Sequence, residues 1–461
     1  MREGAEPTRI ELDLLGEVRV PATALYGAQT ARAVQNFPAT NHRTIGGFPH
    51  LIRALLQIKE SAARTNQAIE ALPSSVAKAI ILAAEQLRVS LPADQFPVHC
   101  LHGGGGTSAN MNANENLANL GEEILGGRRG EYRLVHPNDH VNLHQSTNDV
   151  YPTACHMAVI SQWGLLSGCL GRLTQAFMHL ADVHRAQVRL ARTCFQDAVD
   201  VRYADYFGGM ACQMERLACR LDEAIGRLYE VNLGGTICGR LEDVPQAYLQ
   251  RIIPALASVT KDPRYHRTDN LFDGAQNPDA MVAVSAGLDL LARSLIKIAS
   301  DFRILSSGPE AGLGEISLPA AQPGSSIMPG KVNPVIPEFL IQIGFRVIGN
   351  HAMCAAGLDH GELDLNVWES SMLFPTLESM ELLESGVETF TSRCVLGIYP
   401  NPETNSRHAR TLIPRLTRLS RKYGYQRVTA VCKQATGDPA AMRALLDQYF
   451  PESNQGSPSP D

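Results

Sequence analysis

Three stretches of the chain repeat apolar residues at alternating intervals of four and three. Because 3.6 residues make one helical turn, this spacing places each set on one face of a long helix. The sets are Val159, Trp163, Leu166, Leu170, Leu173, Phe177 and Leu180; Phe207, Met210, Met214, Leu217, Leu221, Ala224 and Leu228; and Val284, Leu288, Leu291, Leu295, Ile298, Phe302 and Leu305. An apolar segment over 337–348, continuing toward Cys354, adds a fourth element. Four such elements predict a mainly α fold with a long central helical bundle.

The regions on either side of these stretches differ in composition. Residues 1–147 mix shorter helical patterns with loops rich in Gly and Asn, and residues 396–450 carry shorter, more polar elements. The last eleven residues contain no apolar side chain. We therefore expect three domains, over 1–147, 148–395 and 396–450, followed by a disordered tail over 451–461.

Bulk composition narrows the classes of function. The chain has 461 residues, 44% of them hydrophobic, and a net charge of −6 without a basic cluster. This charge favours neither nucleic acid nor a membrane surface as a partner. No apolar stretch has membrane-spanning length, and residues 1–6 lack the apolar run of a signal peptide. Ten cysteines show no C-x-x-C pair and no zinc-type spacing with His. We expect reduced thiols in a cytoplasmic protein, with no metal and no cofactor.

The first polar region is Gly-Gly-Gly-Gly-Thr-Ser over 103–108, followed by Asn110, Asn112 and Asn114. Glycines allow the backbone to approach a ligand closely, and the Thr107 hydroxyl adds a donor. The dinucleotide-binding pattern fails because Ser108 occupies its last glycine position. A flexible surface turn explains the loop equally well, and buried structural hydrogen bonds explain the asparagines.

The second polar region, Ser146-Thr147-Asn148, directly precedes the first long helix. A helix N-terminus supplies free N–H groups and a positive dipole end, so it can bind a carboxylate. Simple capping of the helix is the alternative. A third segment contains Thr193 and Cys194, which by themselves are typical of core packing.

The most specific segment is Gly-Ser-Ser-Ile-Met-Pro-Gly-Lys-Val-Asn-Pro over 324–334. It combines hydroxyls, backbone N–H groups and a fixed positive charge, and is therefore suited to binding an anion. It is not a nucleotide phosphate loop, because five residues separate its glycines and Val332 follows Lys331.

This string closely resembles the signature of the aspartase/fumarase superfamily, and the likeness extends over roughly residues 9–400. Residues 26–30, 105–108, 110–112 and 362–367 look like corresponding family segments, several in the form typical of its ammonia-lyase branch. The resemblance implies a mainly α, three-domain fold with a long central bundle. It also implies a homotetramer with active sites shared between subunits, acting on a small dicarboxylate.

The implied reaction removes ammonia or an amine from aspartate or a close analogue and leaves fumarate. By resemblance, Ser325 is the base that takes a proton from carbon, and Glu338 supports the site. The residues expected to bind the substrate are Thr107, Ser146, Thr147, Asn148, Thr193, Cys194, Ser326, Lys331 and Asn333. Gly324 and Gly330 bracket a loop that we expect to close over the substrate.

Cys194 departs from the family pattern, in which a histidine follows the threonine and pairs with a glutamate matching Glu338. A thiol is a weaker hydrogen-bonding group than imidazole. His102 or His144 could compensate, or could be unrelated side chains. Three alternatives therefore stay open: a fumarase, a lyase for an N-substituted aspartate, and a catalytically weak scaffold kept for binding or assembly.

Overall fold

The computed structural model describes residues 7–40, 42–435 and 437–451, so most of the predicted tail lies outside the described residues. The chain is mainly helical, as predicted. It divides into two compact units: unit 1 comprises Met1–Cys169, Leu217–Leu295 and Gln342–Gly386, and unit 2 comprises Leu170–Arg216, Ile296–Ile341 and Val387–Asp461. The three-domain division drawn from composition stays a prediction.

Five long helices contribute residues to both units: α5 (Thr147–Val183), α6 (Tyr203–Arg227), α9 (Asp279–Leu305), α10 (Val335–Asp359) and α11 (Glu369–Arg393). The three predicted stripes lie on α5, α6 and α9, and their side chains are buried except that of Ala224, which is half-buried. Leu228 is buried but follows the last residue of α6. The segment 337–348 lies in α10. Helix α11 was not among the predicted elements.

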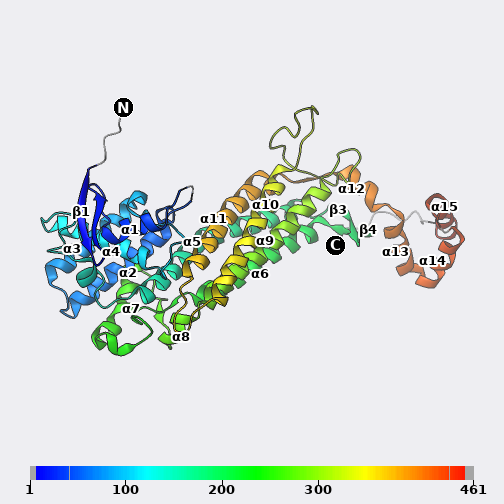
Figure 1. Cartoon of the computed structure of the whole chain (residues 1–461). Coiled ribbons are helices and arrows are strands. Elements are labelled where there is room, and N and C mark those ends of the chain that lie inside the picture. Colours follow the sequence, from blue (N-terminus) through cyan, green and yellow to red (C-terminus); the bar gives the residue numbers. More distant parts are fainter. Residues whose placement is uncertain (1–6, 41, 436, 452–461) are drawn as a thin grey trace. The chain divides into compact units, whose positions relative to one another are not determined.

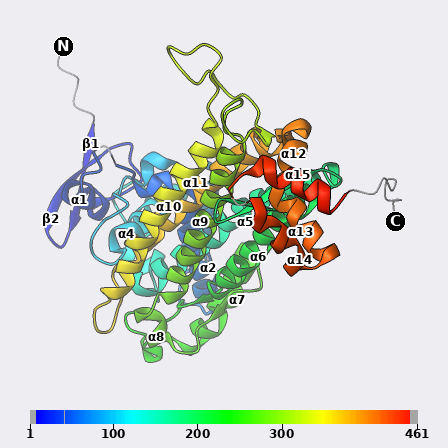
Figure 2. The ribbon, with the colours of Figure 1, turned by 90° about the vertical axis from the view of Figure 1, so that its right-hand side faces the viewer.

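In unit 1, the segments of these helices lie side by side (Figures 1 and 2). Trp163 Nε1 on α5 donates to Asp222 Oδ1 on α6 at 2.6 Å. Asn350 Nδ2 on α10 donates to Ser379 Oγ on α11 at 3.1 Å. Polar bonds therefore fix the register of helices whose apolar stripes provide the packing.

Unit 1 also contains shorter helices and strands. They are β1 (Thr8–Asp13), β2 (Gly16–Pro21), α1 (Ala28–Asn36), α2 (Pro49–Ala68), α3 (Ser74–Ser90), α4 (Thr107–Ile124), β5 (Glu230–Val231), α7 (Gln246–Thr260), β6 (His266–Arg267) and α8 (Leu271–Gln276). Strands β1 and β2 form an antiparallel hairpin, and β5 pairs with β6 in parallel. Buried Glu115 on α4 accepts from the backbone N–H groups of Gly27 and Gln29 at 2.8 Å each, which anchors the start of α1.

In unit 2, an aromatic cluster joins the segments of four long helices. The ring of Phe302 on α9 contacts the rings of Phe177 on α5, Phe207 on α6 and Phe390 on α11. The other elements are β3 (Val188–Thr193), β4 (Gln196–Arg202), β7 (Ile316–Ser317), β8 (Tyr399–Pro400), α12 (Pro402–Ala409), α13 (Leu412–Tyr423), α14 (Tyr425–Cys432) and α15 (Pro439–Tyr449). The last three helices lie close together (Figure 2). Val428 and Leu446 belong to a small apolar core that they share.

Two expectations from composition can be compared with the described residues. Within them, no helix is both long enough and apolar enough to cross a membrane. No disulfide joins cysteines in this part of the chain, and five of the ten cysteines are buried.

Candidate active site

Ser146 and the residues after it form the start of α5 in unit 1. The backbone N–H of Ser146 donates to Asp149 Oδ1 at 2.9 Å, and Ser146 Oγ accepts from the N–H of Asn148 at 3.2 Å. This reciprocal arrangement caps the helix. Helix α5 begins at Thr147, so two residues of the predicted triplet lie in its first turn and do not precede it. Capping of the helix, one of the two alternatives for this region, is therefore confirmed for Ser146.

Thr147 and Asn148 are held in place by neighbouring segments of unit 1. Asn110 Nδ2 on α4 donates to Thr147 Oγ1 at 3.0 Å, and Asn148 Nδ2 donates to the carbonyl of Ile237 at 2.8 Å. Thr107 is the first residue of α4 and lies one helical turn before Asn110. The structure therefore brings the starts of α4 and α5 together.

Gly106, just before α4, has a φ of +86°. A Cβ atom on it would lie 2.2 Å from Tyr151 Cδ1, so only glycine fits. The asparagines that follow serve structure, as one alternative had it: Asn112 Nδ2 and Asn116 Nδ2 both donate to the carbonyl of Gln95 at 2.9 Å. Asn114 Nδ2 donates to Asn142 Oδ1 at 3.1 Å.

A buried lysine that the sequence analysis missed supports this region. Lys59 on α2 has no solvent exposure, and its Nζ donates to Asn142 Oδ1 at 2.9 Å and to Gln145 Oε1 at 3.0 Å. Desolvation lowers the pKa of Lys59 to about 7, and the nearby charge of Asp149 opposes this shift. Burial likewise raises the pKa of Asp149 to about 6. The signal was present, because Lys59 shares a helical face with buried Ile52 and Leu55.

Thr193 and Cys194 lie in unit 2, at the tip of the hairpin formed by β3 and β4. Thr193 pairs with Gln196, which leaves Cys194 and Phe195 as a two-residue turn. Their φ values are +53° and +60°, a region that side chains other than glycine rarely adopt. Both side chains are exposed, Phe195 by 82%. Cys194 is therefore presented outward on a strained turn and is not part of the core.

The stem of this hairpin is anchored by Glu315, whose side chain has no solvent exposure. Its Oε1 lies 2.7 Å from Arg192 Nη1 and 2.9 Å from His408 Nδ1, and its Oε2 lies 3.4 Å from Arg189 Nε. Glu315 therefore neutralises two arginines of β3 directly below the turn. No feature of the sequence indicated this carboxylate.

The predicted base loop, also in unit 2, is closed at its neck. Gly324 N–H donates to the carbonyl of Lys331 at 2.8 Å, and Asn333 Nδ2 donates to the carbonyl of Gly324 at 2.8 Å. A Cβ atom on Gly324 would lie 2.7 Å from the backbone nitrogen of Asn333, so this position requires glycine. Lys331 and Ser326 are exposed on the loop.

The hydroxyl of Ser325 has two backbone donors within this loop. Its Oγ accepts from the N–H groups of Ile327 at 3.2 Å and Met328 at 3.0 Å. Glu338, in the first turn of α10, pairs with Arg303 Nη2 at 3.2 Å. Within unit 2 the partner of Glu338 is therefore the guanidinium of Arg303, and not the imidazole that the family pattern implies.

The two histidines considered as substitutes for the missing imidazole belong to unit 1. His102 is buried, its Nδ1 lies 2.9 Å from the carbonyl of His99, and burial lowers its pKa. His144 has a φ of +60°, its Nδ1 lies 2.8 Å from Asn66 Oδ1, and burial lowers its pKa as well. Both rings are thus neutral groups with structural hydrogen bonds, and their compensating role stays a prediction.

Tertiary structure creates one cluster of metal-ligand types that sequence spacing did not show. Within the described residues, possible ligand atoms of His42, His99 and Cys100 lie within 4.8 Å of one another. However, the N–H of Leu101 donates to His99 Nδ1 at 2.9 Å, which occupies one ring nitrogen. The rings of His42 and His99 stack, and Cys100 Sγ lies 3.6 Å from His42 Nδ1. Stacking and hydrogen bonding account for this cluster, and we assign no metal to it.

The predicted residues therefore form two groups. The group in unit 1 comprises Thr107, Ser146, Thr147 and Asn148, and the group in unit 2 comprises Thr193, Cys194, Ser325, Ser326, Lys331, Asn333 and Glu338. A half-open cavity in unit 1, which is described below, contains none of them. Each group offers what an anionic substrate needs: N–H groups at a helix start in one, and hydroxyls with a lysine in the other.

The helical fold and these two groups define a class of enzyme, the lyases. A family model described as lyase matches residues 16–349. The chain belongs to this family of enzymes, the aspartase/fumarase superfamily, as its loop over 324–334 indicated.

Individual relatives cover nearly the whole chain. Aspartate ammonia-lyase of Bacillus subtilis is 37% identical over 449 residues, which are 97% of this chain and 94% of that protein. Fumarate hydratase class II of Ralstonia nicotianae is 38% identical, over 95% of this chain and 94% of that protein. The crystal structure of fumarate lyase:delta crystallin from Brucella melitensis matches with a TM-score of 0.88 and 40% identity, over 95% of this chain and 100% of that one. These relatives bear two different activities in their names.

Proposed function

We propose that this protein is an ammonia-lyase that eliminates ammonia or an amine from aspartate, or from a close analogue, to give fumarate. The observation that carries the proposal is the pair of N–H donors on Ser325 Oγ. The base is the serine alkoxide, which forms only when the hydroxyl loses its proton. Because a serine hydroxyl is a very weak acid, this requires local stabilisation of the oxyanion. Two backbone donors, with the ammonium group of Lys331 on the same loop, supply that stabilisation.

The proposed reaction proceeds in two steps. Ser325 Oγ, as the alkoxide, takes the proton from the carbon beside a carboxylate, and the electron pair enters that carboxylate as an aci-carboxylate dianion. The pair then forms the carbon–carbon double bond as the carbon–nitrogen bond breaks, and the amine leaves with its electrons and takes up a proton. Donors placed where the dianion develops lower the barrier, because they bind it more tightly than the substrate.

The other predicted residues take the roles that the family pattern implies. The start of α5, with Ser146 and Thr147, binds the reacting carboxylate together with Thr107 and Ser326. The positive end of the helix dipole favours an anion there.

The second carboxylate and the amine contact the remaining predicted residues. Lys331 and Asn333 hold the second carboxylate with Thr193, and Asn148 contacts the amine. Cys194 occupies the exposed hairpin tip next to Thr193, where it reshapes the pocket for the leaving group.

We also propose that the chain forms a homotetramer in the cytoplasm with active sites shared between subunits. Large apolar side chains that are exposed in unit 2 support an oligomer, since Phe195 is 82% and Ile327 is 84% exposed at the proposed catalytic segments. Two inactive variants, Ser325→Ala in unit 2 and Thr147→Ala in unit 1, test this directly. Mixed and reassembled, they regain part of the activity if sites are shared, and none if every site comes from one subunit.

The first experiment is an assay of the purified full chain with L-aspartate and, separately, L-malate, following the ultraviolet absorbance of fumarate. Fumarate from aspartate, lost in Ser325→Ala and kept in the control Ser306→Ala, is the expected result. Ser306 is a suitable control because its Oγ donates only to the carbonyl of Arg303, at 3.4 Å, one turn earlier in α9. Fumarate from malate alone would replace the proposal with the fumarase alternative, which the Ralstonia relative favours.

If neither substrate gives fumarate, two alternatives remain: a lyase for an N-substituted aspartate and a catalytically weak scaffold. Fumarate incubated with a panel of amines then separates these two, because a lyase forms the reverse product. Cys194→His provides a further comparison: increased turnover of aspartate would show that the thiol reshaped an ancestral pocket, and loss of activity would show that it serves the native substrate.

A further inference from the structure

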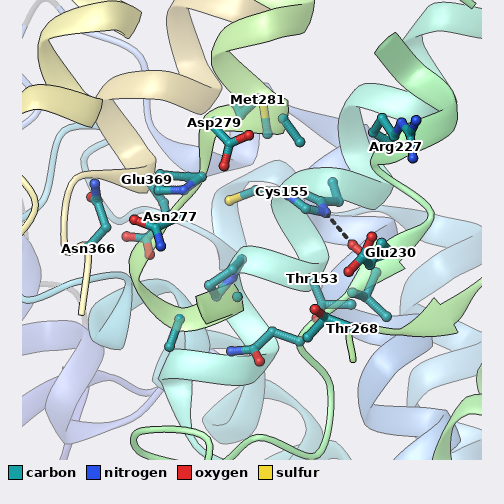
Figure 3. A pocket seen from close by; sticks show the side chains of 18 of the residues that line it. Thr153, Cys155, Arg227, Glu230, Thr268, Asn277, Asp279, Met281, Asn366 and Glu369 are labelled. Atoms are coloured by element: carbon teal, nitrogen blue, oxygen red, sulfur yellow. Dashed lines mark hydrogen bonds between the residues drawn. The ribbon is translucent and has the colours of Figure 1, made fainter. Parts of the chain in front are cut away.

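Unit 1 contains a half-open cavity of about 330 Å³ beside the first turns of α5. Its walls come from α5, the segment 227–232, residues 268–283 and the beginning of α11. Figure 3 shows Cys155 of α5 between Glu369 on one side and Glu230 on the other. The volume is several times the ~30 Å³ that one water molecule occupies in the liquid, and it falls within the range of small-molecule sites.

Glu369 lies deep in this cavity with an unused oxygen. It is the first residue of α11, it is only 7% exposed, and its Oε2 has no hydrogen-bond partner among the described residues. Burial raises the pKa of Glu369 to about 8. A buried carboxyl oxygen without a partner is unfavourable because it has lost its water without gaining a donor, so its presence requires an explanation.

A second buried acceptor lines the same cavity. Asn232 is 5% exposed, and its Oδ1 has no partner among the described residues. Its Nδ2 is used, because it donates to the carbonyl of Asn148 at 3.4 Å. The free atom of Asn232 is therefore an acceptor, like that of Glu369.

Charges at the wall favour a cation. Asp273 and Asp279 are exposed at the mouth, and Glu230 and Arg227 add one charge of each sign. Burial lowers the pKa of His156, which disfavours a positive charge on its imidazole, although the hydrogen bond of its Nδ1 with the carbonyl of Glu230 at 3.2 Å opposes this shift. Acidic groups therefore outnumber basic ones around a cavity whose unused buried atoms are acceptors.

We propose that this cavity binds a small primary ammonium ion, ammonium itself or a short alkylammonium, with Glu369 as counter-ion and Asn232 Oδ1 as a further acceptor. A primary ammonium group carries three donors and no acceptor, which complements these atoms. Carboxylate or phosphate ligands would face uncompensated acidic groups. The short alkyl chain contacts Cys155, Met281 and Met372, which line the cavity. None of the residues proposed for catalysis lines this cavity, and its only link to them is the bond of Asn232 Nδ2 to the backbone carbonyl of Asn148; the proposal does not depend on the reaction.

The test measures stabilisation of the full chain by propylammonium chloride against sodium chloride of equal ionic strength, at pH 8.5. A ligand that binds only the folded state stabilises it by RT ln(1 + [L]/Kd), so the melting temperature keeps rising with the logarithm of ligand concentration above Kd. Glu369→Gln keeps the side-chain volume and removes the charge. Cys155→Met places a larger side chain in the cavity and leaves Glu369 unsubstituted. Glu403→Gln is the matched control, because Glu403 is an exposed glutamate in the first turn of α12 in unit 2.

We expect wild type and Glu403→Gln to show equal shifts that begin near the Kd of propylammonium and then grow with the logarithm of its concentration. The apparent Kd should rise at least tenfold in both Glu369→Gln and Cys155→Met. Circular dichroism establishes whether each variant is folded. If one of the two cavity variants does not fold, the other alone is sufficient for the test. Equal melting-temperature shifts of the wild type in propylammonium chloride and in sodium chloride would overturn the proposal, and would indicate that the cavity holds only water. Binding that persists in both cavity variants would also overturn it, and would assign the ion to the catalytic residues, since an amine is also the proposed product.

Discussion

Neutralising Glu315 should destabilise the protein more than any other single carboxylate-to-amide change in unit 2. In Glu315→Gln the side chain keeps its volume, but its carboxylate no longer balances Arg189 and Arg192. These two arginine side chains are only 10% and 17% exposed, so water cannot replace the lost counter-charge. His408 loses its acceptor at 2.9 Å as well.

The magnitude follows from burial. Removing one partner of a buried ion pair costs about 3–5 kcal/mol, because the remaining charge stays desolvated. Asp200→Asn is the matched control on the same hairpin. Asp200 pairs with Arg418 at 3.2 Å, but their side chains are 44% and 54% exposed, and exposed pairs contribute ~0–1 kcal/mol. We therefore expect a difference of at least about 2 kcal/mol between the two variants.

Urea unfolding followed by far-ultraviolet circular dichroism measures this difference, with one m value fitted to all three proteins. Since β3 carries Thr193 toward the tip, kcat/KM for fumarate formation should also fall in Glu315→Gln and stay within twofold in Asp200→Asn. Equal unfolding midpoints for the two variants would refute the reasoning, because they would show that the buried carboxylate does not anchor the hairpin.

Three further predictions concern other elements. Gly324→Ala should lower the rate of fumarate formation at least tenfold, because its Cβ would lie 2.7 Å from the backbone nitrogen of Asn333. Gly349→Ala in α10 is the control and should leave this rate unchanged, because a Cβ there meets nothing within 4 Å. Equal rates in the two variants would contradict the closed neck of the loop. Lys59 has a pKa of about 7 in the folded protein and near 10.5 when unfolded. The unfolded chain thus binds more protons between these values, so the free energy of unfolding should rise with pH from 7 to 10, by up to about 4 kcal/mol. Urea titrations of wild type and Lys59→Met across this range check it, and a parallel rise in Lys59→Met would exclude the lysine as the cause. Cys194→Asn should stabilise the chain by about 0.5–1 kcal/mol, because asparagine tolerates the φ of +53° better, and a lowered melting temperature would argue against strain at the turn.

Local patterns in the sequence were sufficient for four of the five long helices. The stripes on α5, α6 and α9 repeat at the helical period, and nearly every position in them is buried. Helix α11 escaped prediction because Pro375 lies inside it and glutamates interrupt its apolar positions. The loop over 324–334 carried the family assignment, because its residues are contiguous and their order is specific.

Other parts of the candidate site depend on contacts between distant segments. Glu315 meets β3 more than a hundred residues earlier in the chain, and Lys59 meets Gln145 across 86 positions. Pattern analysis treats one segment at a time, so it gives no role to Glu315, and for Lys59 it can indicate the buried helical face but not the partner. The same limit explains the unused oxygens of Glu369 and Asn232, which become significant only when folding buries them.

The sequence by itself therefore determined the helical class, the family and the identity of the loop with Ser325, because periodicity and contiguous motifs are local properties of the chain. Only the tertiary structure decided that Ser146 caps α5, that Cys194 lies on an exposed strained turn, and that Ser325 Oγ receives two N–H donors. These are matters of burial, hydrogen-bond geometry and charge neutralisation, which depend on where distant segments meet.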